Sequence, residues 1–240
     1  MTRIDVALVE RGLFPSRAKA REAIEAGLVL LDGRKVAKPS EPVAADAQIE
    51  ASAPYEWVSR GGVKLAAALD AFAIDPQGRA CLDVGASTGG FAHVLLSRGA
   101  ASVTCVDVGT GQLHPTIAAD PRVKAMEQTD ARKLVAADLP QAPNLIVIDV
   151  SFISLDRLLP HVLSLAAPTA KLVALIKPQF EAGPEHVKKG VIRDTNIHAI
   201  VCAKIEELIA DCGWRRIGLI ASPIQGGDGN REFLIGAERP

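Results

Sequence analysis

Residues 80–91 read ACLDVGASTGGF, and this stretch decides the fold class of the chain. Its apolar start, Ala80–Val84, predicts a buried strand that runs into a glycine-rich turn. Gly85 would let the backbone turn sharply, and Gly89 and Gly90 would let a ligand approach the main chain. A strand, such a turn and a following helix are typical of the first unit of a nucleotide-type α/β sheet.

The sequence around this unit alternates apolar strands with helices, which predicts a mostly parallel sheet covered on both faces. The predicted strands are Ala80–Val84, Ser102–Val106, Val123–Met126, Leu145–Ile148, Lys171–Ile176, Arg215–Ile220 and Glu232–Gly236. The predicted helices are Val63–Phe72, Phe91–Arg98, Leu155–Leu165 and Ile197–Cys212. We therefore expect an α/β domain of the Rossmann type over residues 61–240.

The first 60 residues have a different pattern and predict a small α+β domain, joined by a linker near residues 55–62. Two helices are expected, one ended by Gly12 and one that begins at Ser16 as its N-cap and ends at Gly27. The turn Asp32-Gly33 predicts a hairpin after them.

Four polar residues lie at the ends of apolar runs or beside the linker, far apart in sequence. Lys64 follows Arg60-Gly61-Gly62-Val63, Asp149 and Lys177 each close an apolar run, and Glu232 opens the last one. Open α/β sheets build their sites at the carboxyl ends of their strands, so these side chains are expected to meet. For Lys64 and Glu232, a solvated helix lysine and an edge-strand glutamate are the alternatives.

The turn itself favours a cationic cofactor over a nucleotide phosphate. Its pattern is G-x-x-x-G-G, without the Gly-Lys-Ser/Thr of a phosphate loop. Asp83 would be a poor neighbour for a pyrophosphate but a good one for the sulfonium or amino group of S-adenosylmethionine. Asp107 would hold ribose hydroxyls and Asp130 the adenine amino group, although strand-end aspartates also cap helices and turns. The predicted cofactor site comprises Asp83, Gly85, Ser87, Thr88, Gly89, Gly90, Phe91, Asp107, Asp130 and Asp149.

Four motifs together resemble the TlyA family of FtsJ-like ribosomal RNA ribose 2′-O-methyltransferases, which are historically also called hemolysins. They are DVGASTGGF (83–91), IVIDVSFISL (146–155), LVALIKPQFEAG (172–183) and GNREFLIG (229–236). The resemblance implies S-adenosylmethionine as cofactor, an antiparallel last strand, and cytidine 2′-hydroxyls of ribosomal RNA or ribosomal subunits as substrate. It also implies a catalytic Lys-Asp-Lys-Glu tetrad at Lys64, Asp149, Lys177 and Glu232.

Methyl transfer to a ribose needs help at the nucleophile, because a hydroxyl hardly ionises near neutral pH. A lysine ammonium near the oxygen would stabilise its developing charge, or a lysine of lowered pKa would accept its proton. We assign that role to Lys177, with Asp149 orienting it. Phe152 is a candidate surface for stacking a flipped nucleotide. The loop residues Lys188-Lys189 and Arg193 are either phosphate contacts or solvated side chains.

The amino-terminal domain carries a local basic stretch. The stretch SRAKAREAIEAGLVLLDG (16–33) is similar to the RNA-binding domain first seen in ribosomal protein S-four. Residues 1–62 hold nine basic and nine acidic side chains, so attraction to RNA would be patchy, and a solvated helix face is the alternative. The predicted RNA-binding residues are Arg11, Arg17, Lys19 and Arg21.

Composition fits this interpretation. The formal net charge is −1, so any RNA site must be local, and no run reaches the roughly 20 apolar residues of a membrane helix. No signal sequence is visible, and the four cysteines lack C-x-x-C spacing, so we expect a cytoplasmic protein with reduced thiols and no metal site. We expect a monomer. A membrane-active hemolysin and a non-catalytic RNA-binding protein of the same fold are the alternatives to an enzyme.

Overall fold

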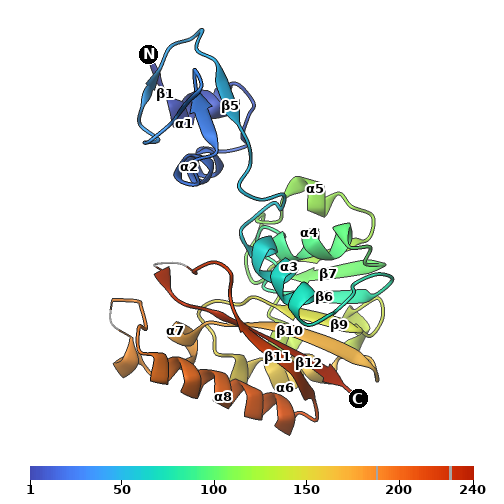
Figure 1. The fold of residues 1–240 in the computed structure, drawn as a ribbon. Helices are drawn as coiled ribbons and strands as arrows, with labels where there is room; N and C mark the ends of the chain where they lie inside the picture. The colour runs from blue at the N-terminus through green and yellow to red at the C-terminus, as the bar shows by residue number, and fades with distance from the viewer. Residues whose placement is uncertain (188, 227–228) are drawn as a thin grey trace. The chain divides into compact units, whose positions relative to one another are not determined.

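A computed structural model of the protein describes residues 1–187, 189–226 and 229–240 (Figure 1). The chain divides into two compact units, Met1–Glu56 and Trp57–Pro240. The first unit has one hydrophobic core and the second has a core on each face of its sheet.

The first unit packs two helices against short strands. The second helix begins as predicted, because the Ser16 hydroxyl accepts a hydrogen bond of 3.3 Å from the backbone N–H of Lys19. The predicted hairpin is β2 paired with β3, and β5 pairs with the other side of β2. The elements are β1 (Thr2–Arg3), α1 (Ile4–Glu10), α2 (Arg17–Glu25), β2 (Val29–Leu31), β3 (Arg34–Lys35), β4 (Pro42–Val43) and β5 (Ile49–Ala51).

A seven-stranded sheet forms the centre of the second unit, in the order β11-β12-β10-β9-β6-β7-β8. Among the described strands of this sheet, β12 alone runs opposite to the other six, which confirms the expected mostly parallel sheet with an antiparallel last strand. The strands are β6 (Ala80–Val84), β7 (Ser102–Val106), β8 (Val123–Met126), β9 (Leu145–Ile148), β10 (Ala170–Ile176), β11 (Arg215–Ala221) and β12 (Phe233–Arg239).

Helices cover both faces of this sheet, as the alternating pattern predicts (Figure 1). On one face α3 and α4 pack against Cys81, Val103 and Val147, and on the other α6 and α8 pack against Leu82 and Ile146. The α-helices are α3 (Gly61–Ala71), α4 (Gly90–Ser97), α5 (Pro115–Ala118), α6 (Leu159–Ser164), α7 (Pro178–Glu181) and α8 (Thr195–Asp211). The 3₁₀ turns are η1 (Ala131–Lys133), η2 (Ala136–Asp138), η3 (Leu155–Arg157) and η4 (Pro184–His186).

One predicted helix is wrong in its extent. Residues Leu155–Leu165 form a 3₁₀ turn, η3, followed by the short helix α6, and not one continuous helix. Pro160 explains the break, because it has no backbone N–H and is tolerated only in the first turn of a helix, where it lies in α6.

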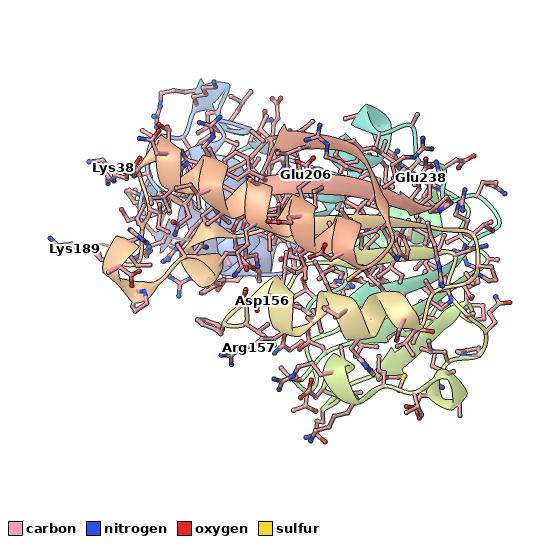
Figure 2. The ribbon with its side chains drawn as sticks, turned by 90° about the horizontal axis from the view of Figure 1, so that it is seen from below. Lys38, Asp156, Arg157, Lys189, Glu206 and Glu238 are labelled. Carbon is pink, nitrogen blue, oxygen red and sulfur yellow. The ribbon has the colours of Figure 1, made fainter. Side chains whose placement is uncertain are left out.

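Ion pairs connect α8 to η3 and to β11. Lys204 Nζ lies 2.9 Å from Asp156 Oδ2, and Arg216 Nη1 lies 2.7 Å from Glu206 Oε2. Figure 2 shows Asp156 and Arg157 on the segment that leads into α6, and Glu206 at α8. Among the described residues, we find no helix with the length and apolar character needed to span a bilayer.

Candidate active site

The glycine-rich turn joins the ends of two neighbouring strands. Gly85 has a φ of +82°, and a Cβ atom there would lie 2.3 Å from the carbonyl oxygen of Asp149. Only glycine fits such a position without displacing the backbone. Past the turn, the Ser87 N–H donates to Asp107 Oδ2 at 2.8 Å, and the Gly109 N–H donates to Asp107 Oδ1 at 2.7 Å. The turn therefore brings the carboxyl ends of β6, β7 and β9 together.

The four predicted tetrad residues meet at this edge of the sheet. Asp149 directly follows β9, and Lys177 directly follows β10, which pairs parallel to β9. Ile176 is the register partner of Phe233, so Glu232, one residue before β12, comes next to Lys177. Lys64 comes from α3, and its Nζ lies 2.6 Å from Glu232 Oε2.

The tetrad consists of two ion pairs, of which Lys64–Glu232 is buried and Lys177–Asp149 is partly buried. Lys177 Nζ lies 2.6 Å from Asp149 Oδ1 and donates a hydrogen bond of 2.8 Å to the hydroxyl of Ser151. The side chains of Lys64 and Glu232 are only 10% and 2% exposed. Pairing of opposite charges offsets the free energy that each charge loses when it leaves water. Four ionisable groups can therefore share one site.

Two cavities open on this edge. The smaller, about 320 Å³, is lined by Lys64, Asp149 and Lys177 and also by the glycine-rich turn. The larger, about 1020 Å³, is lined by Asp107 and Asp130. The residues that line both cavities are Gly85, Ser87, Asp149 and Ser151. Of the other predicted cofactor residues, those at the smaller cavity are Thr88, Gly90 and Phe91, and those at neither are Asp83 and Gly89.

Asp83 lies beneath the turn and is completely buried. No side chain among the described residues donates a hydrogen bond to its carboxyl group, and the backbone N–H of Ala92 opposes the effect of burial only in part. Burial, reinforced by the negative charge of Asp149, raises the pKa of Asp83 to about 8. The structure thus places Asp83 under the site rather than on its surface, and contact with a cofactor stays a prediction.

Asp130 has a partner within the chain. It caps η1 through the Arg132 N–H at 3.0 Å, and the Arg132 guanidinium lies 2.7 Å from it. This side-chain hydrogen bond lowers the pKa of Asp130 to about 2. Asp130 is thus both a turn cap and a charged group on the wall of the larger cavity.

The predicted RNA-binding side chains of the first unit all have intramolecular partners. Arg17 and Arg21 each lie 3.1 Å from Asp5, and Lys19 donates to the Tyr55 hydroxyl. The guanidinium of Arg11 donates to three backbone carbonyls, at Ala44, Ala45 and Ala47. Their contact with RNA stays a prediction.

Sequence reasoning missed several cavity residues. Ser59 and Arg60 line the smaller cavity from the segment before α3, and Gln225 lines it from the loop before β12. Arg60 also donates to the carbonyl of Gln225. The nearness of Ser59 and Arg60 to Lys64 in sequence was the available signal, and Gln225 offered none. The predicted phosphate contact at Lys188 lies outside the described residues, and Lys189 and Arg193 are exposed.

Comparisons with known proteins agree with this geometry. Residues 57–239 match the FtsJ-like methyltransferase family, and residues 2–49 match the S4 domain. The chain is 44% identical to a 16S/23S rRNA (cytidine-2′-O)-methyltransferase TlyA of Mycobacterium tuberculosis, over 97% of this chain and 88% of that protein. It is 37% identical to Hemolysin A of Brachyspira hyodysenteriae, over 97% of this chain and 98% of that protein.

A solved structure has the same fold over nearly the whole chain. A Streptococcus thermophilus protein described as a candidate hemolysin is 40% identical, with a TM-score of 0.79, and the match covers 98% of this chain and 87% of that one. The resemblance seen in the four motifs is confirmed. The chain belongs to the TlyA family of FtsJ-like methyltransferases and carries an S4 domain at its N-terminal end.

Proposed function

We propose that the protein transfers a methyl group from S-adenosylmethionine to the 2′-hydroxyl of a cytidine ribose in ribosomal RNA. The observation that carries the proposal is the pair of Lys–carboxylate contacts beside the glycine-rich turn, of which Lys64–Glu232 is buried and Lys177–Asp149 is partly buried. The cytidine and the ribosomal substrate rest on the activity named for the Mycobacterium tuberculosis relative. Such a substrate would place the protein in the cytoplasm, and we propose that it acts as a monomer.

The residues around the turn fit this cofactor. Asp83 is a buried carboxyl group for which the described residues supply no cationic partner, and Asp149 places a negative charge beside it. A cationic ligand compensates such charges, whereas a pyrophosphate would be repelled. Asp107 would hold the ribose hydroxyls and Asp130 the adenine amino group from the wall of the larger cavity. When bound, S-adenosylmethionine supplies a methyl group that is already activated for transfer.

Lys177 is positioned to act on the nucleophile. Its ammonium group is fixed by Asp149 and by the Ser151 hydroxyl, and it lines the smaller cavity. A fixed positive charge in a site shielded from water stabilises negative charge that develops on a ribose oxygen. Lys64 and Glu232 form the second ion pair at this site, and they would complete an alternating network of charges with Lys177 and Asp149. Asp149 orients the Lys177 ammonium.

Two further features would bind RNA. Phe152 lines the larger cavity, and its side chain is 90% exposed, so its ring is free to stack on an unpaired base. In the S4 domain, Arg17 and Arg21 stay about half exposed despite their contact with Asp5. Their remaining N–H groups would contact RNA phosphates.

The test is transfer of labelled methyl groups to purified ribosomal subunits by the wild type and by Lys177→Ala. We expect label in RNA at a linkage that resists alkali, which marks a ribose 2′-O-methyl group, and a loss of at least about 100-fold in the variant. Lys171→Ala is the matched control. Lys171 lies on the same strand, β10, but pairs with Glu238 at 3.8 Å.

The other outcomes separate the alternatives. Label that persists in Lys177→Ala would refute the role of this lysine but keep the enzyme class. Bound cofactor without label on either subunit would favour another RNA substrate or a non-catalytic RNA-binding protein. Leakage of liposomes caused by the purified protein, and unaffected by Asp149→Ala, would favour the activity for which the Brachyspira relative is named.

A further inference from the structure

The segment that follows β9 carries an aromatic ring in an unusual conformation. We call residues 150–154, which line the larger cavity, the rim segment. Phe152 lies at its centre with a φ of +65°, in the left-handed region that bulky residues seldom occupy. Such a conformation persists only where neighbouring groups hold it, and it is common at functional sites.

Burial does not explain this conformation. The Phe152 side chain is 90% exposed, so folding removes little of its apolar surface from water. A strained backbone that presents an aromatic ring to solvent lowers stability without a compensating gain in the core. The ring is therefore better explained by a ligand that stacks on it than by packing.

The short helix α7 supplies the groups that hold the rim segment. The Glu181 carboxylate accepts a hydrogen bond of 2.6 Å from the Ser154 hydroxyl and one of 2.9 Å from the Leu155 N–H. The Phe180 ring lies beside the Phe152 ring, with 5.1 Å between their centroids. One end of the rim segment is thus fixed by Glu181, and its central ring rests on Phe180.

The other end of the rim segment is fixed by the catalytic lysine. Lys177 pairs with Asp149 and donates to the Ser151 hydroxyl, so the segment is held on both sides of Phe152. All these contacts come from residues 177–181, which directly follow β10. The arrangement couples the position of the stacking ring to that of the lysine.

Burial of the Glu181 carboxylate costs free energy, because the charged group loses contact with water. Burial raises the pKa of its carboxyl group, even though the hydrogen bonds from Ser154 and Leu155 act in the opposite direction. Both oxygens of this partly buried carboxylate accept hydrogen bonds from the end of the rim segment and the residue after it. We therefore expect Glu181 to fix the conformation of the rim segment. Glu185, four residues further along the chain, differs from Glu181 because its side chain is exposed to solvent.

We infer that Glu181 is a positioning residue that, together with Phe180, fixes the rim segment so that Phe152 stacks on the base of the target nucleotide. The inference rests on the proposed function, since it takes an unpaired RNA base as the ligand. Glu181 itself touches neither cavity wall and acts through Phe152.

The test is a double-mutant cycle on Glu181→Gln and Phe152→Ala, read from the affinity for ribosomal subunits. Each single variant should weaken binding by about tenfold, as expected when one stacked base is lost. The double variant should bind about as weakly as Phe152→Ala alone, because Glu181 acts only through that ring. Glu185→Gln is the matched control and should bind like the wild type.

A second readout follows the segment directly. Hydrogen exchange of the peptide spanning residues 150–158 should become at least about tenfold faster in Glu181→Gln, while exchange in α8 stays unchanged. The affinity for S-adenosylmethionine should stay within about threefold of the wild type.

Two results would overturn the inference. One is unchanged exchange of the rim segment together with unchanged binding in Glu181→Gln. The other is fully multiplicative losses in the double variant, which would mean that Glu181 and Phe152 act independently. Absence of methyl transfer by the wild type would count against the proposed function alone, because the cycle is read from binding and not from turnover.

Discussion

Two aspartates, one in each unit, are completely buried, yet their surroundings treat them in opposite ways. Asp5, in the first unit, is surrounded by the guanidinium groups of Arg3, Arg17 and Arg21 at 3.0–3.1 Å. Burial alone would raise the pKa of Asp5, but the hydrogen bonds from these arginines outweigh it and lower the pKa to about 2. Asp83, in the second unit, has no cationic partner among the described residues, and burial beside Asp149 raises its pKa to about 8 although the backbone N–H of Ala92 acts in the opposite direction.

The two aspartates differ in whether the fold supplies cationic partners for the buried carboxyl group. Asp5 ties the start of α1 to α2 through Arg17 and Arg21, so its partners are supplied during folding. The part of the chain that the structure describes supplies no such partner for Asp83, and ionisation of this buried carboxyl group destabilises the folded state. A bound cation would supply the missing partner, so the comparison points to Asp5 as a residue for stability and to Asp83 as a residue for binding.

The largest effect should come from removal of the satisfied charge. Asp5→Ala is expected to destabilise the first unit by about 3 kcal/mol, because several charge-assisted hydrogen bonds are lost at once. Hydrogen exchange of peptides from α1 and α2 would measure it. Asp46→Ala, which removes an exposed aspartate of the same unit, should change the stability by less than about 0.5 kcal/mol. Equal effects of the two substitutions would remove the basis of the comparison.

The stabilisation from Asp5 should also depend on pH in a defined range. Its pKa is lower in the folded than in the unfolded state, so this stabilisation is present above about pH 4 and is lost as the pH falls towards 2.

Asp83→Asn should have an effect of comparable size and opposite sign. The folded pKa of Asp83 is raised, so its contribution to stability is greatest below about pH 4 and is lost as the pH rises towards 8. Between pH 5 and pH 7.5 the stability of the variant relative to the wild type should therefore rise, by roughly 3 kcal/mol. Both tryptophans, Trp57 and Trp214, lie in the second unit, so tryptophan fluorescence during urea unfolding follows this unit.

The same variant sharpens the binding side of the comparison. If Asp83 compensates a cationic cofactor, Asp83→Asn should weaken S-adenosylmethionine binding by about tenfold at pH 8, as measured by calorimetry. The affinity of the wild type should increase with pH up to about 8, and that of the variant should not. A variant that binds as tightly as the wild type would mean that Asp83 is only a structural residue of the turn.

The smallest effect concerns the arginines that surround Asp5. Arg17 and Arg21 have half-exposed side chains, so Arg17→Ala and Arg21→Ala should each weaken RNA binding several-fold and lower the salt dependence by about one phosphate contact. Arg11 donates to three backbone carbonyls, so Arg11→Ala should lower the stability of the first unit with little change in the salt dependence of RNA binding. Filter binding at several salt concentrations distinguishes the two patterns.

Much of the sheet could be predicted because buried parallel strands have a strong local signal. The bounds of β6, β7, β8 and β9 agree with the predicted ranges, since each is a short run with clear ends. The helix expected over Leu155–Leu165 failed because periodicity alone does not reveal that Pro160 must lie in a first turn. Gln225 could not be found at all, because nothing in its local sequence indicates that its loop lines the smaller cavity.

The sequence by itself determined the fold class and the glycine-rich turn, because these depend on local patterns and on motifs shared with a family. It also predicted the four tetrad residues. Only the tertiary structure decided how they pair, since the contact of Lys64 with Glu232 joins residues 168 positions apart. The tertiary structure also decided that Asp5 is surrounded by arginines, whereas the described residues supply no cationic partner for Asp83. Burial and pairing are properties of the packed chain, and the same residue type acquires opposite pKa shifts according to what packs around it.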